Sequence, residues 1–558
     1  MTTRRTVSTA IALFLALVLT ACAGLPTGGP VHVGKAIDEV EGPPDFSYVP
    51  NSPVKDATPQ QIVEGFIAAG SGPRGNWKVA QEFLTTTFRQ KWQPQAGVTV
   101  YAPGESSISS SVENELVFSV EPVATVDATG SYRPADRGRI PFTFSLAKER
   151  GQWRIAQAPD GIILDANRFG SVFQSYDLSY FDRGWRTLIP DVRWFPSTNP
   201  ATRITAALVS GSPSPWLAES VRSAFTGEVT LTQPSVPVES GTAQISFDPS
   251  IRDLNRETLA RMKTQLEASL AGAGILDVQM LVGDEPLDVT ARTTRSTAVD
   301  ARPLVLRDGA FGFLSGNDIE KVAGLGEALD DADPDAVETD AARTTAAVRT
   351  GSGAILRVSA DGTQTQLDTR AGMTAPTIDT FGYIWTVPED QPGEVVAYGP
   401  DGTARKVPAG WVGATEVAAM RVSRDGARLA ALVRAGGQWS VWVAGIVRDE
   451  SGSVPTSLGQ PLPVANLSGR GIDLSWIDGA TIAIVYVDGQ QRVIREQTVG
   501  GQGTEVRGPD GVVAISGGNQ SGSVFLLTED GSLYAQRGSW QILASDVSVL
   551  AEQQGLPG

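Results

Sequence analysis

The chain has 558 residues, of which 41% are apolar and 19% charged, so it can bury hydrophobic cores. Its length predicts about three domains. The formal charge of −17 at pH 7 argues against nucleic acid as a partner, because nucleic acid repels an acidic surface. A single histidine, His32, and a single cysteine, Cys22, leave little for histidine or thiolate catalysis or for multi-histidine metal sites. We therefore expect no enzyme activity, no catalytic residues, no metal and no cofactor.

Residues 1–21 have the three parts of an export signal peptide. Arg4 and Arg5 form a positive amino-terminal region, residues 11–18 form an apolar core, and small residues precede Cys22. This core is too short to cross about 30 Å of hydrocarbon comfortably. A cleaved signal is therefore favoured over a permanent transmembrane helix.

The tetrapeptide Leu19-Thr20-Ala21-Cys22 resembles the lipobox of bacterial lipoproteins. The resemblance implies that the Cys22 thiol receives a diacylglycerol, that residues 1–21 are removed, and that the new amino group is acylated, with palmitate as the expected chain. Two or more acyl chains anchor a protein stably to a membrane. We therefore expect a cell-membrane protein, bound to membrane lipid through Cys22 on the extracytoplasmic side. The alternative is a buried free cysteine close to a discarded signal peptide.

A tether and an α+β domain are predicted next. Residues 22–57 are rich in glycine and proline, as in flexible linkers. The α+β domain is expected over residues 58–168, where Thr58-Pro59-Gln60-Gln61 has the pattern of a capping box. A second helix is predicted over 76–92, where apolar residues recur every four positions. Strand-like runs follow at 116–120, 123–126, 140–146 and 153–156, and this succession resembles nuclear transport factor 2-like (NTF2-like) domains, whose fold does not assign function.

A second α+β domain is expected over residues 169–295. The run Leu188-Ile189-Pro190-Asp191-Val192-Arg193 predicts one arm of a hairpin. Helices are predicted after Asn199-Pro200, over 216–225 and over 259–270, and strands over 243–247 and 278–282. The order of these elements, with the hairpin run and a late helix before the last strand, resembles the GerMN domain.

The remaining residues, 296–552, predict an all-β propeller. Short strand-like runs alternate with Asp-Gly pairs, which favour tight hairpin turns. The pairs begin at Asp308, Asp361, Asp401, Asp425, Asp478, Asp488 and Asp530. A repeat of roughly 40–50 residues predicts about five to seven blades. The runs 428–433 and 439–443 are predicted as inner and outer strands of one blade. The alternative is a pair of β-sandwiches.

An acidic stretch over residues 327–340 contains three alternating aspartates, a spacing that could bind calcium. They are Asp331, Asp333 and Asp335. Counted from Asp331, the sixth position needs glycine and holds Ala336, and the twelfth needs glutamate and holds Ala342. A solvated loop insertion between propeller strands is favoured.

Six tryptophans of the predicted propeller could stack on cell-wall sugars. They are Trp385, Trp411, Trp439, Trp442, Trp476 and Trp540. Packing between the blades is the favoured interpretation.

The order of the predicted segments resembles that of the LpqB family of actinobacterial lipoproteins. These segments are the lipobox, the tether, the α+β domain, the GerMN-like domain and the propeller. The family is described as an accessory of the MtrAB two-component system. The resemblance implies a non-enzymatic protein that binds the ectodomain of the MtrB-like sensor histidine kinase and modulates signalling linked to the cell envelope and division. The alternative is a protein that binds or processes cell-wall glycan through the propeller or GerMN surface.

Overall fold

The computed structural model describes residues 50–112, 114–135, 138–225 and 227–555. The described residues all belong to one compact unit. The predicted signal peptide, the lipobox with Cys22 and most of the tether lie outside them. Within the described ranges, no helix is both long enough and apolar enough to cross a membrane.

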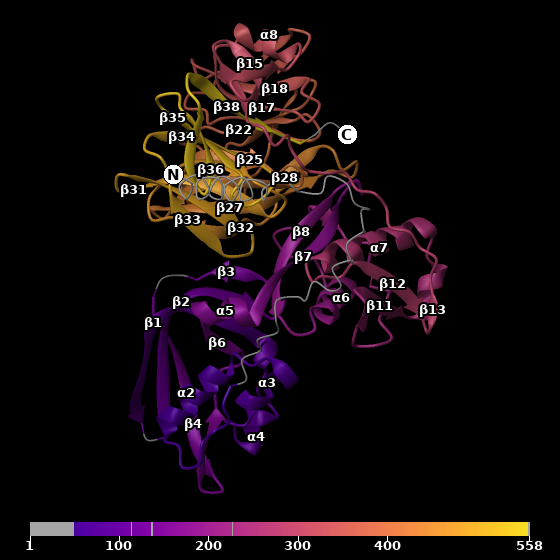
Figure 1. Cartoon of the computed structure of the whole chain (residues 1–558), viewed down its shortest axis with the longest axis vertical. Helices are drawn as coiled ribbons and strands as arrows, with labels where there is room; N and C mark the ends of the chain where they lie inside the picture. The colour runs from indigo at the N-terminus through magenta and orange to yellow at the C-terminus, as the bar shows by residue number, and fades with distance from the viewer. Residues whose placement is uncertain (1–49, 113, 136–137, 226, 556–558) are drawn as a thin grey trace, which may run out of the picture. The chain divides into compact units, whose positions relative to one another are not determined.

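The amino-terminal part of the described chain is an α+β domain, whose class is as predicted (Figure 1). Its strands pair in the order β5-β4-β2-β1-β6, with β3 beside β2. The capping box is confirmed: the Thr58 side chain accepts from the Gln61 amide, and the Gln61 side chain accepts from the Thr58 amide. The elements are α2 (Pro59–Ala69), α3 (Arg74–Gln81), α4 (Thr86–Arg89), η1 (Pro94–Ala96), β1 (Gly97–Val112), β2 (Glu115–Asp127), β3 (Tyr132–Pro134), β4 (Ile140–Glu149), β5 (Gln152–Gln157), β6 (Ile162–Asp165) and α5 (Ala166–Val172).

The single helix predicted over 76–92 is wrong, because the chain breaks between α3 and α4. The amide of Thr85 donates to the Ile155 carbonyl at 2.9 Å, and the Ile155 amide donates to the Phe83 carbonyl at 2.9 Å. This pairing with β5 takes the backbone groups that a continuous helix would need. Thr85 then caps α4 by accepting from the Phe88 amide. Leu84 is nevertheless buried. The apolar spacing over 76–92 therefore indicated a buried residue but not a continuous helix.

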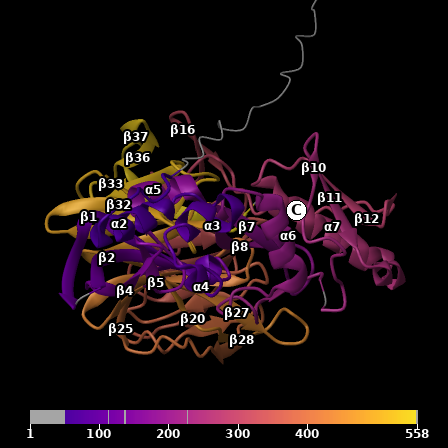
Figure 2. The same ribbon diagram turned by 90° about the horizontal axis from the view of Figure 1, so that it is seen from below.

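The middle domain contains two sheets and two helices, and its mixed α+β class is as predicted. The long hairpin β7–β8 is confirmed, and α7 packs against β7 and lies beside β12 (Figures 1 and 2). The helix predicted over 216–225 is wrong: its end forms β9, in which Arg222 pairs with Phe181 of β7. The elements are β7 (Phe173–Asp182), β8 (Leu188–Pro196), α6 (Pro200–Ser210), β9 (Val221–Arg222), β10 (Val238–Glu239), β11 (Thr242–Phe247), η2 (Pro249–Asp253), α7 (Arg256–Ala271), β12 (Asp277–Val282) and β13 (Glu285–Pro286).

The carboxy-terminal part is a propeller of six blades, so the β-sandwich alternative is wrong. An eight-stranded sheet holds the first two blades, which meet where β38 runs parallel to β17 (Figure 1). The innermost strands are β38, β17, β21, β25, β30 and β34. The first blade joins β38 (Val547–Gln553) to β14 (Leu304–Arg307), β15 (Ala310–Ser315) and β16 (Asp318–Lys321). Because its strands come from both ends of the domain, pairing of β14 with β38 closes the ring.

The other five blades follow in chain order. They comprise α8 (Leu325–Asp330), β17 (Pro334–Thr339), β18 (Thr345–Thr350), β19 (Ile355–Ser359), β20 (Gln364–Asp368); β21 (Thr377–Ile378), β22 (Ile384–Thr386), β23 (Val396–Tyr398), β24 (Ala404–Lys406); β25 (Ala414–Val422), β26 (Arg428–Ala435), β27 (Gln438–Arg448), β28 (Pro455–Leu458), β29 (Leu462–Asn466); β30 (Arg470–Trp476), β31 (Thr481–Asp488), β32 (Gln491–Thr498), β33 (Gly503–Arg507); β34 (Val512–Gly517), β35 (Val524–Thr528), β36 (Leu533–Arg537) and β37 (Ser539–Ala544). Runs 428–433 and 439–443 share a blade as predicted, but they form its second and third strands, because β25 lies innermost.

Four of the six tryptophans of the propeller pack inside it, as predicted. Trp385 is fully buried, and Trp411, Trp439 and Trp476 are at most 8% exposed. Trp442 and Trp540 are partly buried and pack against apolar clusters of the propeller. The four buried indoles therefore offer no open platform for a sugar ring.

Candidate functional site: the propeller channel

The innermost strands of the propeller surround a cavity of about 250 Å³. Five of these strands, β17, β25, β30, β34 and β38, contribute residues to its wall, and Ala375 and Pro376 contribute just before β21. Charged side chains project into this space even though the strands that carry them are largely apolar. The cavity is called the channel below.

Four charged residues of the channel are buried: Glu338, Arg421, Asp473 and Glu552 are 3–8% exposed. The guanidinium of Arg421 pairs with the Asp473 carboxylate at 3.1 Å. The second carboxylate oxygen of Asp473 accepts from the Ile515 amide at 3.1 Å. One arginine therefore faces three acidic side chains.

Glu338 and Glu552 stand next to one another, because they are register partners on the parallel strands β17 and β38. Glu338 Oε1 accepts from the Thr377 hydroxyl at 2.9 Å, from the Gln554 amide group at 2.6 Å and from the Ile378 amide at 3.3 Å. Glu552 Oε2 accepts from the Ser475 hydroxyl at 2.9 Å. The other oxygens, Glu338 Oε2 and Glu552 Oε1, are buried and have no hydrogen-bond partner among the described residues.

Burial of these acids changes their protonation. It raises the pKa of Glu552 to about 8; Arg421 opposes this rise, and the carboxylates of Glu338 and Asp473 add to it. Burial likewise raises the pKa of Glu338 and of Asp473, again against the attraction of Arg421. Near neutral pH, the Glu552 carboxyl is therefore mainly protonated.

One end of the channel carries a partly exposed ion pair, and buried hydrogen bonds cross the other end. At the first end, Arg349 pairs with Asp335 at 2.8 Å, and both side chains are partly exposed. At the other end, where the inner strands finish, Gln554 donates to the Val422 carbonyl at 3.2 Å. The Arg424 guanidinium spans the ends of two further blades by donating to the carbonyls of Trp476, Ile477, Gly517 and Gly518.

Sequence reasoning missed this site. The favoured solvated loop within 327–340 is wrong: the stretch forms α8 and the innermost strand β17, and it delivers Glu338 to the channel. The available signal was a charged residue inside an apolar strand, as in Val417-Ala418-Ala419-Met420-Arg421-Val422. The described residues hold no group of three or more His, Cys, Asp or Glu side chains arranged to bind a metal ion.

The hairpin β7–β8 contacts both neighbouring domains through the run that resembled a GerMN domain. Arg193 pairs with Asp191 at 2.8 Å, and both are buried. Arg193 also donates to the Thr129 carbonyl of the amino-terminal domain at 2.9 Å. The Trp194 indole donates to the Gly500 carbonyl of the propeller at 2.9 Å. This segment therefore links all three domains by buried polar contacts.

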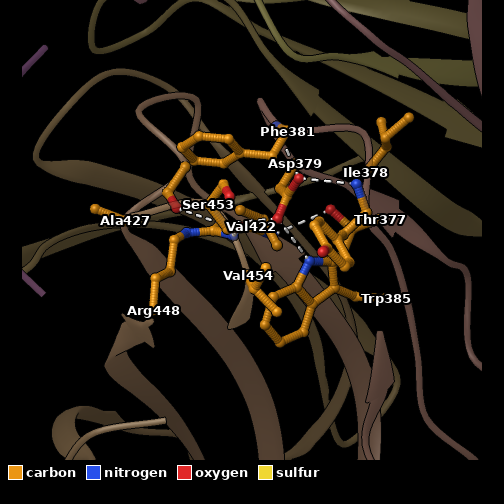
Figure 3. A network of polar contacts seen from close by, with 12 residues as sticks. Thr377, Ile378, Asp379, Phe381, Trp385, Val422, Ala427, Arg448, Ser453 and Val454 are labelled. Atoms are coloured by element: carbon orange, nitrogen blue, oxygen red, sulfur yellow. Dashed lines mark hydrogen bonds and ion pairs between the residues drawn. The ribbon is translucent and has the colours of Figure 1, made fainter. Parts of the chain in front are cut away.

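A second buried network holds two propeller blades together (Figure 3), and Arg186 of the β7–β8 turn adjoins it. The Asp379 carboxylate accepts from Arg448 at 2.7 Å and from the Trp385 indole at 3.1 Å. The Arg448 guanidinium lies 4.4 Å from the centre of the Phe381 ring. Arg186, from the β7–β8 turn, lies 5.1 Å from the same ring. Every charged group here already has a partner, so the network is structural.

Comparison with known proteins gives two matching family models. The model of the N-terminal domain of lipoprotein LpqB matches residues 52–170, and that of the LpqB β-propeller domain matches residues 309–549. A lipoprotein LpqB from Bifidobacterium longum is 25% identical and aligns over 99% of both chains. Another from Nocardia farcinica is 27% identical over 85% of this chain and 84% of its own. Neither family model describes an enzyme.

Solved structures with a similar backbone include TolB from Acinetobacter baumannii (TM-score 0.27, 10% identity, 73% of this chain and 79% of that chain). A nidogen/laminin complex matches with a TM-score of 0.34 and 12% identity over 45% of this chain and 97% of that chain. The tandem GerMN domains of the Bacillus subtilis sporulation protein GerM match with a TM-score of 0.19 and 16% identity over 24% and 55%.

Proposed function

The chain belongs to the LpqB family of lipoproteins, and on that premise we propose that it is a non-enzymatic, extracytoplasmic accessory protein of a two-component system. Its folded part would bind the ectodomain of an MtrB-like sensor histidine kinase and modulate signalling linked to the cell envelope and division. The observation that carries the proposal is the match of separate family models to the amino-terminal domain and to the propeller.

Two features of the molecule support a role in binding rather than catalysis. The buried contacts of Arg193 and Trp194 hold three domains together, which suits a protein that presents a fixed surface to a partner. The charged groups of the Asp379 network are all paired and leave no free nucleophile or base. A fold of this kind does not assign function by itself.

The glycan hypothesis loses four of the six tryptophans on which it was based. Stacking on a sugar needs an exposed indole face, and Trp385, Trp411, Trp439 and Trp476 are buried. We therefore place glycan binding second, as an outcome that the following experiment can reveal.

The test is crosslinking in cells that express the tagged full-length protein, followed by mass spectrometry of the membrane fraction. We expect the sensor kinase among the crosslinked partners, and direct, saturable binding of the purified full-length protein to the kinase ectodomain. A Cys22→Ala variant is the control, because it should lose membrane attachment and still bind the ectodomain in solution. Recovery of only cell-wall enzymes or glycan fragments would contradict the proposal.

A further inference from the structure

The paired acids Glu338 and Glu552 are the least expected feature of the channel. Two carboxyl groups opposite one another on neighbouring strands repel when both are ionised. Burying a polar oxygen without a hydrogen-bond partner destabilises the folded state. Here one oxygen of each carboxyl is left in that state, and both residues line the same cavity. The propeller therefore maintains an arrangement that a hydrogen-bond donor of positive charge would stabilise.

The rest of the channel indicates what kind of donor fits. When both carboxyls are ionised, their unpartnered buried oxygens are acceptors, so the ligand must supply N–H or O–H groups. The lining carries four acids, Asp335, Glu338, Asp473 and Glu552, against two arginines, Arg349 and Arg421, so a cation is favoured over an anion. Ile472, Val513 and Leu550 line the wall, so an apolar stem would also be accommodated. The volume of about 250 Å³ limits the ligand to a small group.

We propose that the propeller channel is a binding site for a small organic cation, an alkylammonium or alkylguanidinium group whose N–H donors bind the free oxygens of Glu338 and Glu552. The cation enters at the end marked by Asp335 and Arg349, because Gln554 and Arg424 close the other end. A free small molecule and a lysine or arginine side chain of a partner protein carry the same chemistry. The inference does not depend on kinase binding.

The protonation of the site predicts how binding changes with pH. Since burial raises the pKa of Glu552 to about 8, this carboxyl must lose its proton to pair with a cation. The other charged groups around it are Glu338, Asp473 and Arg421, with Arg424 at the closed end. Affinity for the cation should therefore rise as the pH increases from about 6 to 8.

The test is titration calorimetry of the full-length protein in detergent micelles with n-butylammonium and n-butylguanidinium chloride, at pH 6, 7 and 8. We expect saturable binding that strengthens with pH, and no binding of n-butanol, which lacks the charge. In a second arm of the experiment, the protein is titrated with Nα-acetyl-lysine methylamide, which represents a lysine side chain of a partner protein. Stronger binding of this compound than of the simple amines would identify a partner side chain as the source, and the reverse would identify a free small molecule.

Variants assign the binding to the channel. Glu338→Gln and Glu552→Gln should each weaken binding at least about tenfold, whereas Glu529→Gln, on the propeller surface, should leave it unchanged. Val513→Trp should obstruct the wall without altering either acid, and because Val513 is 39% exposed the variant should fold. Absence of saturable binding at every pH, or unchanged binding by Glu338→Gln and Val513→Trp, would overturn the inference while leaving the kinase proposal intact.

Discussion

At the scale of single residues, burial decides the chemistry of this protein more than residue type does. Glu338 and Glu552 lie in the same cavity as Arg421, yet only Asp473 pairs directly with that arginine. The two glutamates depend on neutral donors such as Thr377 and Ser475 instead. Neutral donors stabilise a buried carboxylate less than a guanidinium does, which agrees with the raised pKa of Glu552.

Glu552→Gln should change how stability depends on pH. The pKa of Glu552 is raised from 4.5 to about 8 in the folded state, so between these values the folded protein holds a proton that the unfolded chain releases. The wild type should lose up to about 1.4 kcal/mol per pH unit from this group as the pH rises through that window. Thermal unfolding at pH 5.5 and pH 8 measures the effect. The fall in Tm should be smaller for Glu552→Gln, and equal to the wild-type fall for Glu529→Gln.

Asp379→Ala should destabilise the propeller, because it leaves the buried guanidinium of Arg448 without its carboxylate. Removing one partner of a buried pair typically costs about 3–5 kcal/mol. Denaturant unfolding followed by tryptophan fluorescence reports the loss. Asp510→Ala is the matched control, since its carboxylate is 83% exposed, and a cost as small as that of the control would show that the pair is dispensable.

At the scale of elements, the hairpin β7–β8 joins the three domains. Its outer strand carries Asp191, Arg193 and Trp194, and their partners come from the amino-terminal domain, the middle domain and the propeller. The apolar core is also shared, since Trp216 and Leu217 belong to the same buried cluster as Leu462 and Val464 of the propeller. Domain movement therefore requires breaking buried contacts.

Arg193→Met should loosen this junction, because it removes the donors to Thr129 and Ser212 and leaves Asp191 buried beside a neutral side chain. Limited proteolysis should then release domain-sized fragments faster than from the wild type. Arg133→Met, at an exposed position of β3, should not alter the rate. Equal cleavage of all three proteins would mean that the apolar contacts alone hold the domains.

At the scale of the whole molecule, the ring of blades depends on its two ends meeting. β38 supplies the innermost strand of the first blade and also runs beside β17 of the second. It carries Glu552 into the channel, while Gln554, just beyond it, reaches Glu338 and the Val422 carbonyl. The last strand therefore completes both the fold and the candidate site.

Truncation after residue 546 should prevent the propeller from folding, because it removes β38, which pairs with both β14 and β17. Truncation after residue 555 keeps every contact that β38 makes with the described residues and should leave the unfolding temperature unchanged. Circular dichroism and size-exclusion chromatography of the two proteins provide the comparison. A folded, monodisperse product from the shorter chain would contradict closure by β38.

Cys22→Ala tests the anchor at the same scale. Without the thiol, no diacylglycerol can be attached, so the protein should either leave the membrane fraction or accumulate as an unprocessed precursor of higher mass. Fractionation with immunoblotting measures both outcomes. A mature-sized protein that stays on the membrane would rule out lipidation at Cys22.

The sequence by itself determined the elements whose signal is local. The capping box at Thr58, the apolar face of α7 and the repeated strands and Asp-Gly corners of the propeller all depend on neighbouring residues, and these elements are present. Apolar spacing did not separate helix from other buried structure over 76–92, because there the partner strand β5 lies far along the chain. The acidic stretch likewise looked solvated, since nothing near Glu338 in the sequence shows that it faces a cavity.

Only the tertiary structure decided which charged side chains meet in the channel. Glu338 and Glu552 become neighbours because the closing strand β38 runs parallel to β17, a contact between the beginning and the end of the propeller. The pairing of Arg421 with Asp473 and the end closure by Gln554 arise in the same way. Strand pairing across a closed ring depends on the register of all six blades together, and no local pattern of residues specifies it.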